Sequence, residues 1–402
     1  MKVSRCLAIA VCSLTWMAAV QQELFAATYV MEEVMGGLVS PRGLAWGPDG
    51  GLYVAEAGSG GDGPIVVLGN GSTALLGSTS GLSRLVGGIQ ERVLNGLPSV
   101  ATASGQDAGG LQEIAFDGSG QAFGLFAFGA DATQRDDNLG PAGAPLGTIA
   151  RLSLDGTGTI EPIADIAAHE RTFNPAGGSL DSNPFGMART ASGDFVVTDA
   201  GANDLLRATP LGVVSTLAVL PAQPNPLPFG PPVYQSVPTG LTIGPDDAYY
   251  FGQLTGFPFP PGAANVYRFD PDTNELSVAH AGFTNIIDLM FDDEGNLYVL
   301  QISSNGLASM MGPGPGALFK IDGMTDERTL IVSDGLLFPT SVLAGPDGAL
   351  YVSNLGTSPG GGQVLRLSQV PEPRSFLFAA IGAMSLIYCG SRKNEKEDSD
   401  VL

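Results

Sequence analysis

The residue types most often used for catalysis and metal binding are scarce in this chain. It contains two histidines, His169 and His280, and each follows an alanine-containing run rather than a catalytic motif. The three cysteines, Cys6, Cys12 and Cys389, lie near the chain ends, so the central part holds no disulfide and no cysteine metal site. No Gly-x-Ser-x-Gly turn, zinc spacing, phosphate loop or dinucleotide fingerprint is present. We expect both histidines to be structural or surface residues.

Acidic residues at repeated positions are the remaining candidates for chemistry. Glu113 and Asp288 stand where the other copies of a repeated hairpin carry Gly or Ser. A carboxylate is costly to bury unless it is paired or binds a metal, and Ca²⁺ prefers several carboxylate and amide oxygens. Three further oxygen ligands, Glu56, Asp199 and Asn354, end the second strand of their hairpins. These five residues are the metal-site candidates, with calcium as the ion, and no other cofactor is indicated.

Turn formation is the alternative role for several of these acidic residues. Asp199 opens the run Asp-Ala-Gly-Ala-Asn203, a pattern whose usual role is turn hydrogen bonding. Residues 270–274 begin like a calcium loop but have Glu275 where the loop needs Gly and Ala281 where it needs Glu. We therefore expect residues 270–274 and 292–296 to be turns between strands.

A recurring hairpin motif organises the chain. In its clearest copy, residues 41–56, two apolar runs flank Pro48-Asp49-Gly50-Gly51, and this turn chemistry predicts a β-hairpin. Its five further copies start near residues 111, 183, 237, 285 and 338, and the equivalent positions are Gly43, Glu113, Gly186, Gly240, Asp288 and Ser341. A spacing of about 50 to 70 residues is typical of propeller blades.

Further strands are predicted after each hairpin. Third-strand candidates with an apolar–polar rhythm are residues 65–68, 148–152, 205–208, 265–269, 317–321 and 363–367. A fourth strand per repeat is predicted as well, for example at residues 212–217 and 328–332. Four strands per repeat predict an all-β fold, a six-bladed β-propeller with four-stranded blades over residues 28–369. A β-sandwich is the alternative, but sandwiches do not repeat their turn motif. We expect residues 29–34 to close the ring by pairing with the last blade.

Long irregular segments interrupt the repeat. Residues 77–104 are expected to be an insertion and residues 131–145 a long loop, while residues 221–238 are rich in proline. The Gly-rich residues 58–63, 312–316 and 358–362 occupy similar positions in their blades, so we expect them on one face of the disc. Loops of this length in compact domains are usually functional or mobile.

Composition excludes one class of partner. The chain of 402 residues has 57 Gly and 29 Pro, and 44% of its residues are hydrophobic, which fits a turn-rich β-protein with a substantial core. Its net charge of −22 provides no basic surface for nucleic acid. An acidic surface keeps an exported protein soluble and attracts divalent cations.

The first residues have the pattern of a secretory signal. Lys2 and Arg5 form a basic start, residues 6–20 are mostly apolar, and Ala26-Ala27 are small residues near a cleavage point. We assign residues 1–27 to a signal peptide with a signal helix. The alternative, an uncleaved anchor, needs a longer apolar run.

The last residues carry a specific short motif. Pro371-Glu372-Pro373 precedes an apolar stretch, residues 376–389, and then the basic pair Arg392-Lys393. This segment, residues 370–402, resembles the PEP-CTERM sorting signal of bacteria that export proteins through an exosortase. The resemblance implies a short hydrophobic helix, cleavage near the triplet and an exosortase partner. The acidic residues 395–402 depart from the family pattern. A plain C-terminal anchor is the alternative.

The repeats also resemble a known family. Residues 37–58, Gly110-Leu111-Gln112, residues 183–186 and residues 237–241 are similar to the ScyD/ScyE family of exported bacterial proteins, and the likeness spans most of residues 28–369. More loosely, the repeat is similar to NHL and gluconolactonase-type six-bladed propellers. The resemblance implies fold and export rather than a chemistry.

Three functions remain open. We favour an exported, non-enzymatic binding or scaffold module of the periplasm, cell surface or extracellular matrix, a monomer that binds a polysaccharide or protein through its loop face. It would meet the membrane only through its terminal segments. The alternative is a Ca²⁺-dependent lactonase or esterase whose ligands converge at the central channel. A pigment-pathway accessory role rests on the family resemblance alone.

Overall fold

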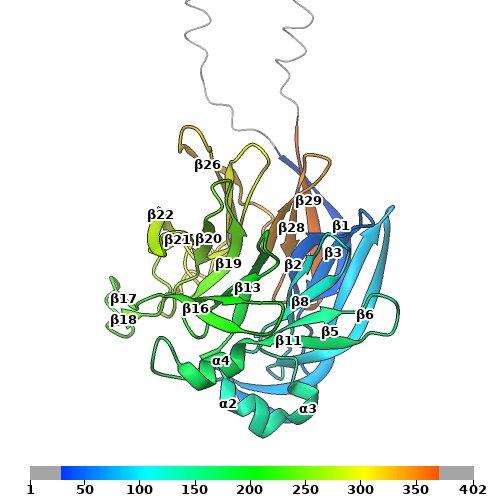
Figure 1. Ribbon diagram of the computed structural model, residues 1–402. Coiled ribbons are helices and arrows are strands. Elements are labelled where there is room, and N and C mark those ends of the chain that lie inside the picture. The colour runs from blue at the N-terminus through cyan, green and yellow to red at the C-terminus, as the bar shows by residue number, and fades with distance from the viewer. Residues whose placement is uncertain (1–28, 371–402) are drawn as a thin grey trace, which may run out of the picture. The chain divides into compact units, whose positions relative to one another are not determined.

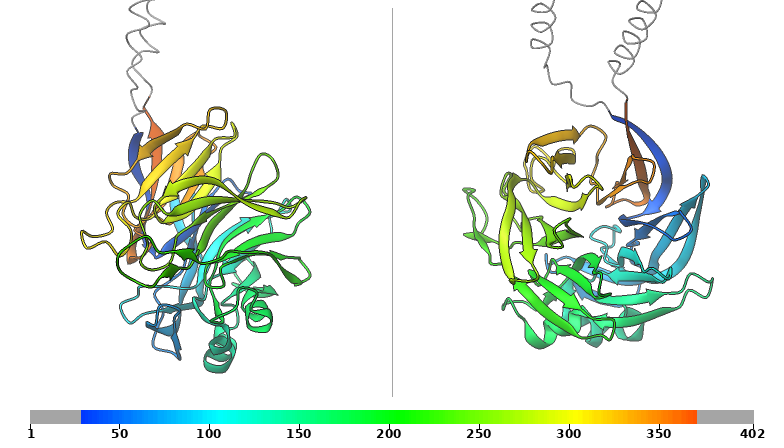
Figure 2. Two further views of the ribbon diagram at one scale, coloured as in Figure 1. Left: turned by 90° about the vertical axis from the view of Figure 1, so that its left-hand side faces the viewer. Right: turned by 45° about the horizontal axis from the view of Figure 1, so that its top comes forward.

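The repeated hairpins form six sheets arranged radially around a common centre, which confirms the predicted six-bladed propeller (Figures 1 and 2). The computed structural model describes residues 29–370. The first strand of each hairpin copy is the innermost strand of its sheet, and the innermost strands of neighbouring sheets contact each other around the ring. The predicted signal peptide and sorting segment lie outside the described residues, apart from Val370.

Blades two to five run in order from the innermost to the outermost strand. Blade two contains β7 (Leu111–Phe116), β8 (Ala122–Phe126), β10 (Thr148–Leu152) and β11 (Ile160–Asp165). Blade three contains β13 (Pro184–Arg189), β14 (Phe195–Asp199), β15 (Asp204–Ala208) and β16 (Val214–Val219). Blade four contains β19 (Pro238–Ile243), β20 (Tyr249–Gln253), β21 (Ala264–Asp270) and β22 (Glu275–Phe283). Blade five contains β23 (Ile286–Phe291), β24 (Leu297–Gln301), β25 (Ala317–Ile321) and β26 (Arg328–Val332).

Blade one differs from the prediction. Its strands are β2 (Pro41–Trp46), β3 (Leu52–Glu56), β4 (Ile65–Val67), β5 (Thr73–Val86) and β6 (Ile89–Ala101). The third strand is β5, not residues 65–68, because β3 pairs with residues 81–85. The expected insertion at residues 77–104 is therefore wrong: most of it forms the β5–β6 hairpin. The short strand β4 has two exposed side chains and pairs only with the start of β5.

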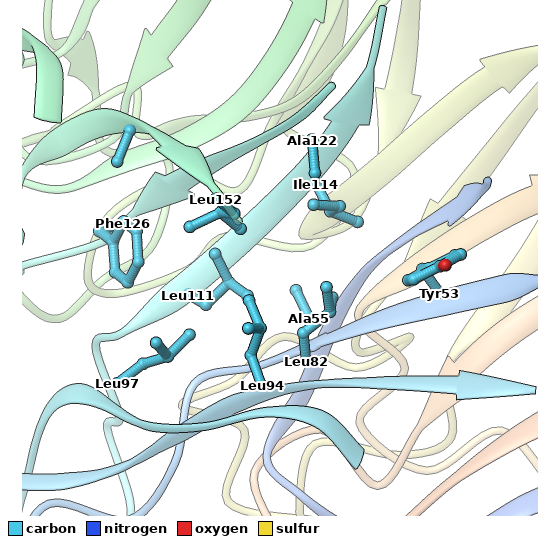
Figure 3. Close-up of a cluster of buried hydrophobic side chains, with 11 residues drawn as sticks. Tyr53, Ala55, Leu82, Leu94, Leu97, Leu111, Ile114, Ala122, Phe126 and Leu152 are labelled. Carbon is cyan, nitrogen blue, oxygen red and sulfur yellow. The ribbon is translucent and has the colours of Figure 1, made fainter. Parts of the chain in front are cut away.

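The long hairpin of blade one is held by its apolar side chains. Leu82 of β5 and Leu94 and Leu97 of β6 are almost fully buried and pack with Leu111 and Phe126 of blade two (Figure 3). Each such leucine contributes about 2 kcal/mol or more of burial free energy. Residues 65–68 are also apolar, but Val66 and Leu68 pack in a separate cluster with Phe128 and Ala130, away from the β3 pairing.

Blade six joins the two ends of the described chain. It contains β27 (Ser341–Ala344), β28 (Leu350–Asn354), β29 (Pro359–Gln369) and, as its outermost strand, β1 (Tyr29–Val39). This pairing confirms the expected closure of the ring. Because the outermost strand comes from the opposite end of the chain, the sheet itself closes the ring without a disulfide.

Loops and turns divide between the two faces of the disc. Antiparallel strands alternate in direction, so the connections between second and third strands, and those between blades, share one face, which we call the loop face. The first-to-second and third-to-fourth connections share the other, the turn face. Residues 58–63, 221–238 and 312–316 thus lie on one face, as expected, whereas residues 359–362 belong to β29.

Short elements cover part of the loop face. They are β9 (Ala130–Asp131), α2 (Ala132–Gln134), the π-helical turn η1 (Arg135–Leu139), α3 (Gly140–Gly143), α4 (Ile166–Phe173), β12 (Asp181–Ser182), β17 (Gln223–Pro224) and β18 (Val233–Tyr234). The expected loop at residues 131–145 is largely the helical segment α2–η1–α3. In the range 29–370 no helix is long and apolar enough to cross a membrane.

The Asp of the repeated turn has a second role besides turn formation. In blade one Asp49 accepts hydrogen bonds from the Gly51 N–H, the Tyr53 hydroxyl and the Arg84 guanidinium. Blades four and six repeat the Asp–Tyr–Arg contact with Asp246, Tyr250 and Arg268, and with Asp347, Tyr351 and Arg366. This clamp ties the first three strands of a blade together at the turn face.

Candidate functional site

The six equivalent positions of the hairpin line the centre of the ring. Gly43, Glu113, Gly186, Gly240, Asp288 and Ser341 lie on β2, β7, β13, β19, β23 and β27, the innermost strands. The two carboxylates belong to blades two and five, which stand on opposite sides of a six-bladed ring. The sequence therefore located both acidic side chains at the centre correctly.

Glycines beside the carboxylates provide the space that they occupy. A Cβ atom on Gly43 would lie 2.1 Å from Glu113 Oε2, and one on Gly240 would lie 2.2 Å from Asp288 Oδ1. At Gly186 a Cβ would instead meet the Thr239 carbonyl oxygen of the next blade at 2.7 Å. The placement of each carboxylate after a glycine in the ring is thus steric, since Glu113 fills the space beside Gly43 and Asp288 the space beside Gly240.

Asp288 is buried and hydrogen-bonded on one side. Its Oδ2 accepts hydrogen bonds from the Ser341 hydroxyl and the Val342 N–H of blade six, each at 2.8 Å. Burial raises the pKa of Asp288 to about 6, although these two donors oppose the shift. The serine at the sixth equivalent position is therefore a partner of the aspartate.

Glu113 experiences a stronger electrostatic penalty. Burial, and after it the nearby charge of Asp288, raise the pKa of the Glu113 carboxyl well above its usual range, and a hydrogen bond from the Ile114 N–H offsets little of this. Burial thus raises the pKa of both carboxyl groups, so each keeps its proton to a higher pH than an exposed carboxyl does. Chemically, such a pair can donate or accept a proton or bind a cation.

Arg42 of β2 precedes Gly43 and is a partly buried charged residue that the sequence did not single out. Its guanidinium donates to the carbonyl oxygens of Gly356, at 2.7 Å, and Ala108, at 3.1 Å, which belong to blade six and the segment before blade two. Burial lowers the pKa of Arg42 to about 10, and the charge of Asp107 opposes this. Little in the sequence indicated this burial, because the only feature of Arg42 was its position one residue before Gly43 of the first hairpin.

The other three predicted metal ligands are used inside their own blades. Glu56 accepts from the Val39 N–H and the Ser83 hydroxyl, at 2.7 and 2.6 Å. Asn354 accepts from the Leu337 N–H at 2.7 Å and donates to the Gly335 carbonyl. These residues close the loops that enter or leave the second strand. They do not join Glu113 and Asp288.

Asp199 is likewise engaged away from the centre. Its carboxylate accepts from the Ser182 hydroxyl and from the N–H groups of Asn183, Gly201 and Ala202, at 2.6 to 3.0 Å. The turn role proposed for the Asp-Ala-Gly-Ala-Asn203 run fits this arrangement. Asn203 also accepts from the Val237 N–H at 2.9 Å.

The predicted calcium centre is not assembled from its five residues. Of the five, only Glu113 and Asp288 lie on innermost strands, and Asp288 Oδ2 already accepts two hydrogen bonds. Throughout residues 29–370, no three His, Cys, Asp or Glu side chains form a group that could hold a metal ion as it stands. We derive no metal-dependent step at the centre.

The two histidines lie on outer elements. His169 of α4 shares a hydrogen bond of 2.9 Å with the Thr216 hydroxyl and packs against the Phe173 ring. His280 of β22 lies 3.8 Å from an Asp326 carboxylate oxygen. Both histidines lie on or beside the outermost strands β16 and β22, whereas Glu113 and Asp288 lie on the innermost strands β7 and β23.

Comparisons with known proteins identify the fold and no closer family. No protein-family model matches the chain, and no curated protein matches it. A gluconolactonase from Xanthomonas campestris has 12% identity and a TM-score of 0.50 over 87% of this chain and 94% of its own. A protein of unknown function from Bacteroides thetaiotaomicron has 10% identity and a TM-score of 0.51 over 85% and 76%. The chain thus has the fold of gluconolactonase-like six-bladed propellers.

A solved structure with a higher sequence identity does not narrow the assignment beyond the fold. A candidate oxidoreductase (glucose dehydrogenase) from Thermus thermophilus has 19% identity over 85% of this chain and all of its own, with a TM-score of 0.49. Identities this low indicate a shared architecture only, because one fold supports many functions.

Proposed function

We propose that the chain is an exported, non-enzymatic binding module that engages a partner through its loop face. The observation that carries this proposal is a set of exposed apolar side chains on that face, Phe229, Phe257, Met310, Met311 and Leu337. We call this set the apolar patch. Met310 and Met311 are almost completely exposed, at 103% and 92%. Exposed apolar surface of this kind marks interaction sites.

The loops that carry the apolar patch touch one another. A Cβ atom on Gly230 would lie 3.3 Å from the Phe257 ring, and one on Gly306 would lie 2.6 Å from the Phe259 carbonyl oxygen. The Gly316 N–H donates to the Leu336 carbonyl, joining the methionine loop to the Leu337 segment. Three blades thus present one connected surface.

The chemistry of the apolar patch favours a protein partner. Methionine and phenylalanine offer flexible apolar contact and few hydrogen-bonding groups, whereas a polysaccharide requires many. The centre of the ring supports a hydrolase less well, because four of its six positions carry Gly or Ser and only two carry a carboxylate. A lactonase or esterase therefore remains the alternative rather than the leading function.

The terminal motifs supply the proposed location. We infer export from residues 1–27, sorting by an exosortase from Pro371-Glu372-Pro373 and Arg392-Lys393, and membership of the ScyD/ScyE family from the repeats. These proposals rest on sequence motifs. Together they assign the propeller to the periplasm, cell surface or extracellular matrix.

Peptide and glycan arrays would test the proposal. We expect the wild-type protein to bind a subset of peptides, and a Met310→Ser/Met311→Ser variant to lose at least about tenfold in affinity, because the exposed anchors are removed. Leu211→Ser is the matched control, since Leu211 is 93% exposed in a turn-face connection. Its binding should be unchanged.

Two results would contradict this function. Equal binding by the wild type and the methionine variant would place the interaction elsewhere. Hydrolysis of δ-gluconolactone by the wild type that Glu113→Gln abolishes would favour the hydrolase instead. Binding to glycans alone, lost in the methionine variant, would keep the face but replace the protein partner with a polysaccharide.

A further inference from the structure

Four acidic side chains meet on the loop-face side of blade three. Glu170 lies on α4, Asp181 on β12, Asp199 at the end of β14 and Asp204 at the start of β15. Helix α4 contacts β12, and Asp199 and Asp204 are directly opposite partners in the β14–β15 pair. Directly opposite residues have Cβ atoms about 5 Å apart, so two like charges there are destabilising. We call these four residues the blade-three acidic cluster.

Three of the four carboxyl groups have buried oxygens without hydrogen-bond partners, whereas Asp199 is hydrogen-bonded. Asp204 is 0% exposed and Glu170 is 2% exposed. Both carboxylate oxygens of Glu170, both of Asp204 and Oδ1 of Asp181 are buried atoms with no hydrogen-bond partner. An unsatisfied buried polar group costs about 1 to 3 kcal/mol, and a charged one costs more. Five such atoms in one place need compensation, by a bound cation or by protons.

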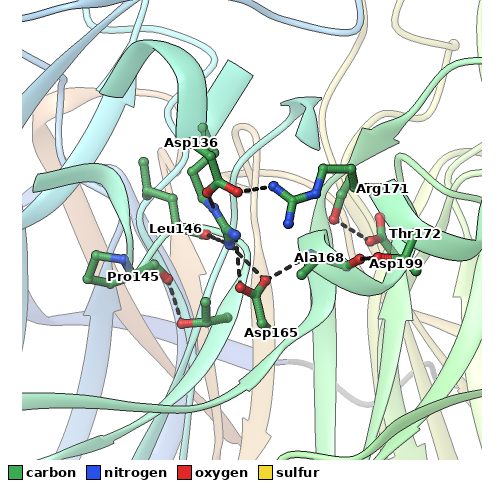
Figure 4. Close-up of polar contacts among 11 residues, drawn as sticks. Asp136, Pro145, Leu146, Asp165, Ala168, Arg171, Thr172 and Asp199 are labelled. Carbon is green, nitrogen blue, oxygen red and sulfur yellow. Dashed lines mark hydrogen bonds and ion pairs between the residues drawn. The ribbon is translucent and has the colours of Figure 1, made fainter. Parts of the chain in front are cut away.

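Nearby arginines do not supply the missing charge. Arg135 pairs with Asp165 and Asp136, and Arg171 pairs with Asp136, on the side of α4 shown in Figure 4. Among residues 29–370, no ion pair includes Glu170, Asp181, Asp199 or Asp204. The cluster therefore holds up to four negative charges and no counter-ion of its own.

The electrostatics of the cluster agree with its geometry. Burial, followed by the charges of Asp199 and Asp181, raises the pKa of Glu170 to about 7. Burial and the charges of Asp199 and Asp131 raise the pKa of Asp181 to about 6. Burial, Asp199 and Glu170 raise the pKa of Asp204 well above its usual range. Each group lowers its energy by acquiring positive charge nearby.

We propose that the blade-three acidic cluster binds a Ca²⁺ ion that ties α4 and β12 to the β14–β15 connection. Ca²⁺ takes six to eight oxygen ligands in irregular arrangements, and every side chain of the cluster offers only carboxylate oxygens. Mg²⁺ is less suitable because it demands near-octahedral geometry. This site lies on blade three, apart from Glu113 and Asp288 at the centre.

Ion binding requires a small movement of side chains. No three acidic groups of residues 29–370 already surround a common point, so Glu170 must turn toward Asp204 when the ion enters. Glu170 has three rotatable side-chain bonds. Neither carboxylate gives up a hydrogen bond by moving, because neither makes one. The orphan oxygens are thus free to become ligands.

Thermal unfolding and calorimetry of the full chain, in excess CaCl₂ and in EGTA at pH 7.5, test the proposal. We expect calorimetry to show that the wild-type protein binds Ca²⁺. We also expect Ca²⁺ to raise the midpoint of thermal unfolding by about 3 °C or more. Asp204→Asn should lose this rise and yet unfold at a higher temperature than the wild type in EGTA, because it removes an unpaired buried charge. Asp293→Asn, an exposed turn residue, is the control.

Further variants separate this site from the centre of the ring. Glu170→Gln should lose the Ca²⁺ response as Asp204→Asn does, and Asp288→Asn should keep it. The proposal is overturned if Ca²⁺ leaves the wild-type midpoint unchanged while Asp204→Asn raises it, since the carboxyl groups would then hold protons instead. It is also overturned if the Ca²⁺ response survives both Asp204→Asn and Glu170→Gln.

Discussion

Asp288 shows how burial and hydrogen bonding oppose each other at one residue. Its carboxylate has two donors, from Ser341 and Val342, yet its pKa is raised to about 6 because desolvation outweighs them. A carboxyl whose pKa is raised in the folded state holds its proton more tightly there than in the unfolded chain. Its contribution to stability is therefore greatest below its ordinary pKa and falls as the pH rises.

A pH series would measure this effect. Between about pH 4 and pH 6 the unfolded chain loses the Asp288 proton before the folded protein does, so the free energy of unfolding should fall by roughly 3 kcal/mol from this group. Asp288→Asn should remove that part of the fall in urea unfolding at pH 4 and pH 7. The Asp293→Asn control should keep it, and an unaltered slope in Asp288→Asn would contradict the assignment.

Sequence reasoning found some of the buried acidic residues and missed others for a physical reason. Glu113 and Asp288 were visible because a repeat gives each position five comparisons, and a carboxylate among glycines is conspicuous. Glu170 lies on a helix outside the repeat, and Asp204 follows the turn run by one residue. Their burial depends on how α4 packs over blade three, which the pattern of residues in the chain does not determine.

At the scale of the element, turn chemistry predicted the hairpins and loop geometry decided the exceptions. Gly- and Asp-containing turns located the innermost pair of strands in every blade, and in three blades the Asp of a Pro-Asp turn also binds a Tyr and an Arg. Blade one was misassigned because residues 65–68 are a continuous apolar run that reads as a strand, and residues 65–67 do form β4. The place beside β3 is nevertheless taken by residues 81–85 of β5.

Gly58 is the position at which the loop after β3 tolerates least change. Its φ is +85°, and a Cβ there would lie 2.6 Å from the Ser80 N and 2.7 Å from the Ser99 hydroxyl. Gly71 has the same φ of +85° and no atom within 4 Å of that position. Both replacements by Ala carry the cost of a positive φ, about 1 kcal/mol, and only the first carries a backbone clash.

The matched pair separates strain from clash. We expect Gly58→Ala to lower the free energy of unfolding by about 2 kcal/mol more than Gly71→Ala, because the β3–β5 pairing must shift to admit the methyl group. Urea denaturation of both variants measures the difference. Equal losses in the two variants would show that the β5 backbone moves away at no cost.

At the scale of the molecule, the ring depends on one seam between blade six and blade one. The Thr340 hydroxyl donates to the Pro41 carbonyl, and the Ser353 hydroxyl donates to the Arg42 carbonyl. The Trp46 indole N–H donates to the Ala344 carbonyl at 2.8 Å, and its ring packs edge-on against Tyr351. The outermost strand of blade six, β1, adds Met35 and Leu38 to the core beside this seam.

Weakening β1 should open this seam before the other blades unfold. Leu38 is 1% exposed, so Leu38→Ala should cost about 2 to 4 kcal/mol, whereas Val30→Ala, at 53% exposure on the same strand, should cost little. Trp46 and Trp16 are the only tryptophans of the chain, so a Trp16→Phe background makes fluorescence a probe of the seam.

In that background, Leu38→Ala should lower the urea midpoint followed by Trp46 fluorescence more than the midpoint followed by far-ultraviolet circular dichroism. The reason is that Leu38 belongs to the core shared by blades six and one, where the ring closes through the pairing of β1 with β29. Coincident midpoints in the variant would show instead that the six blades unfold as one cooperative unit. The propeller would then owe its stability to the whole ring, and no seam could be opened separately.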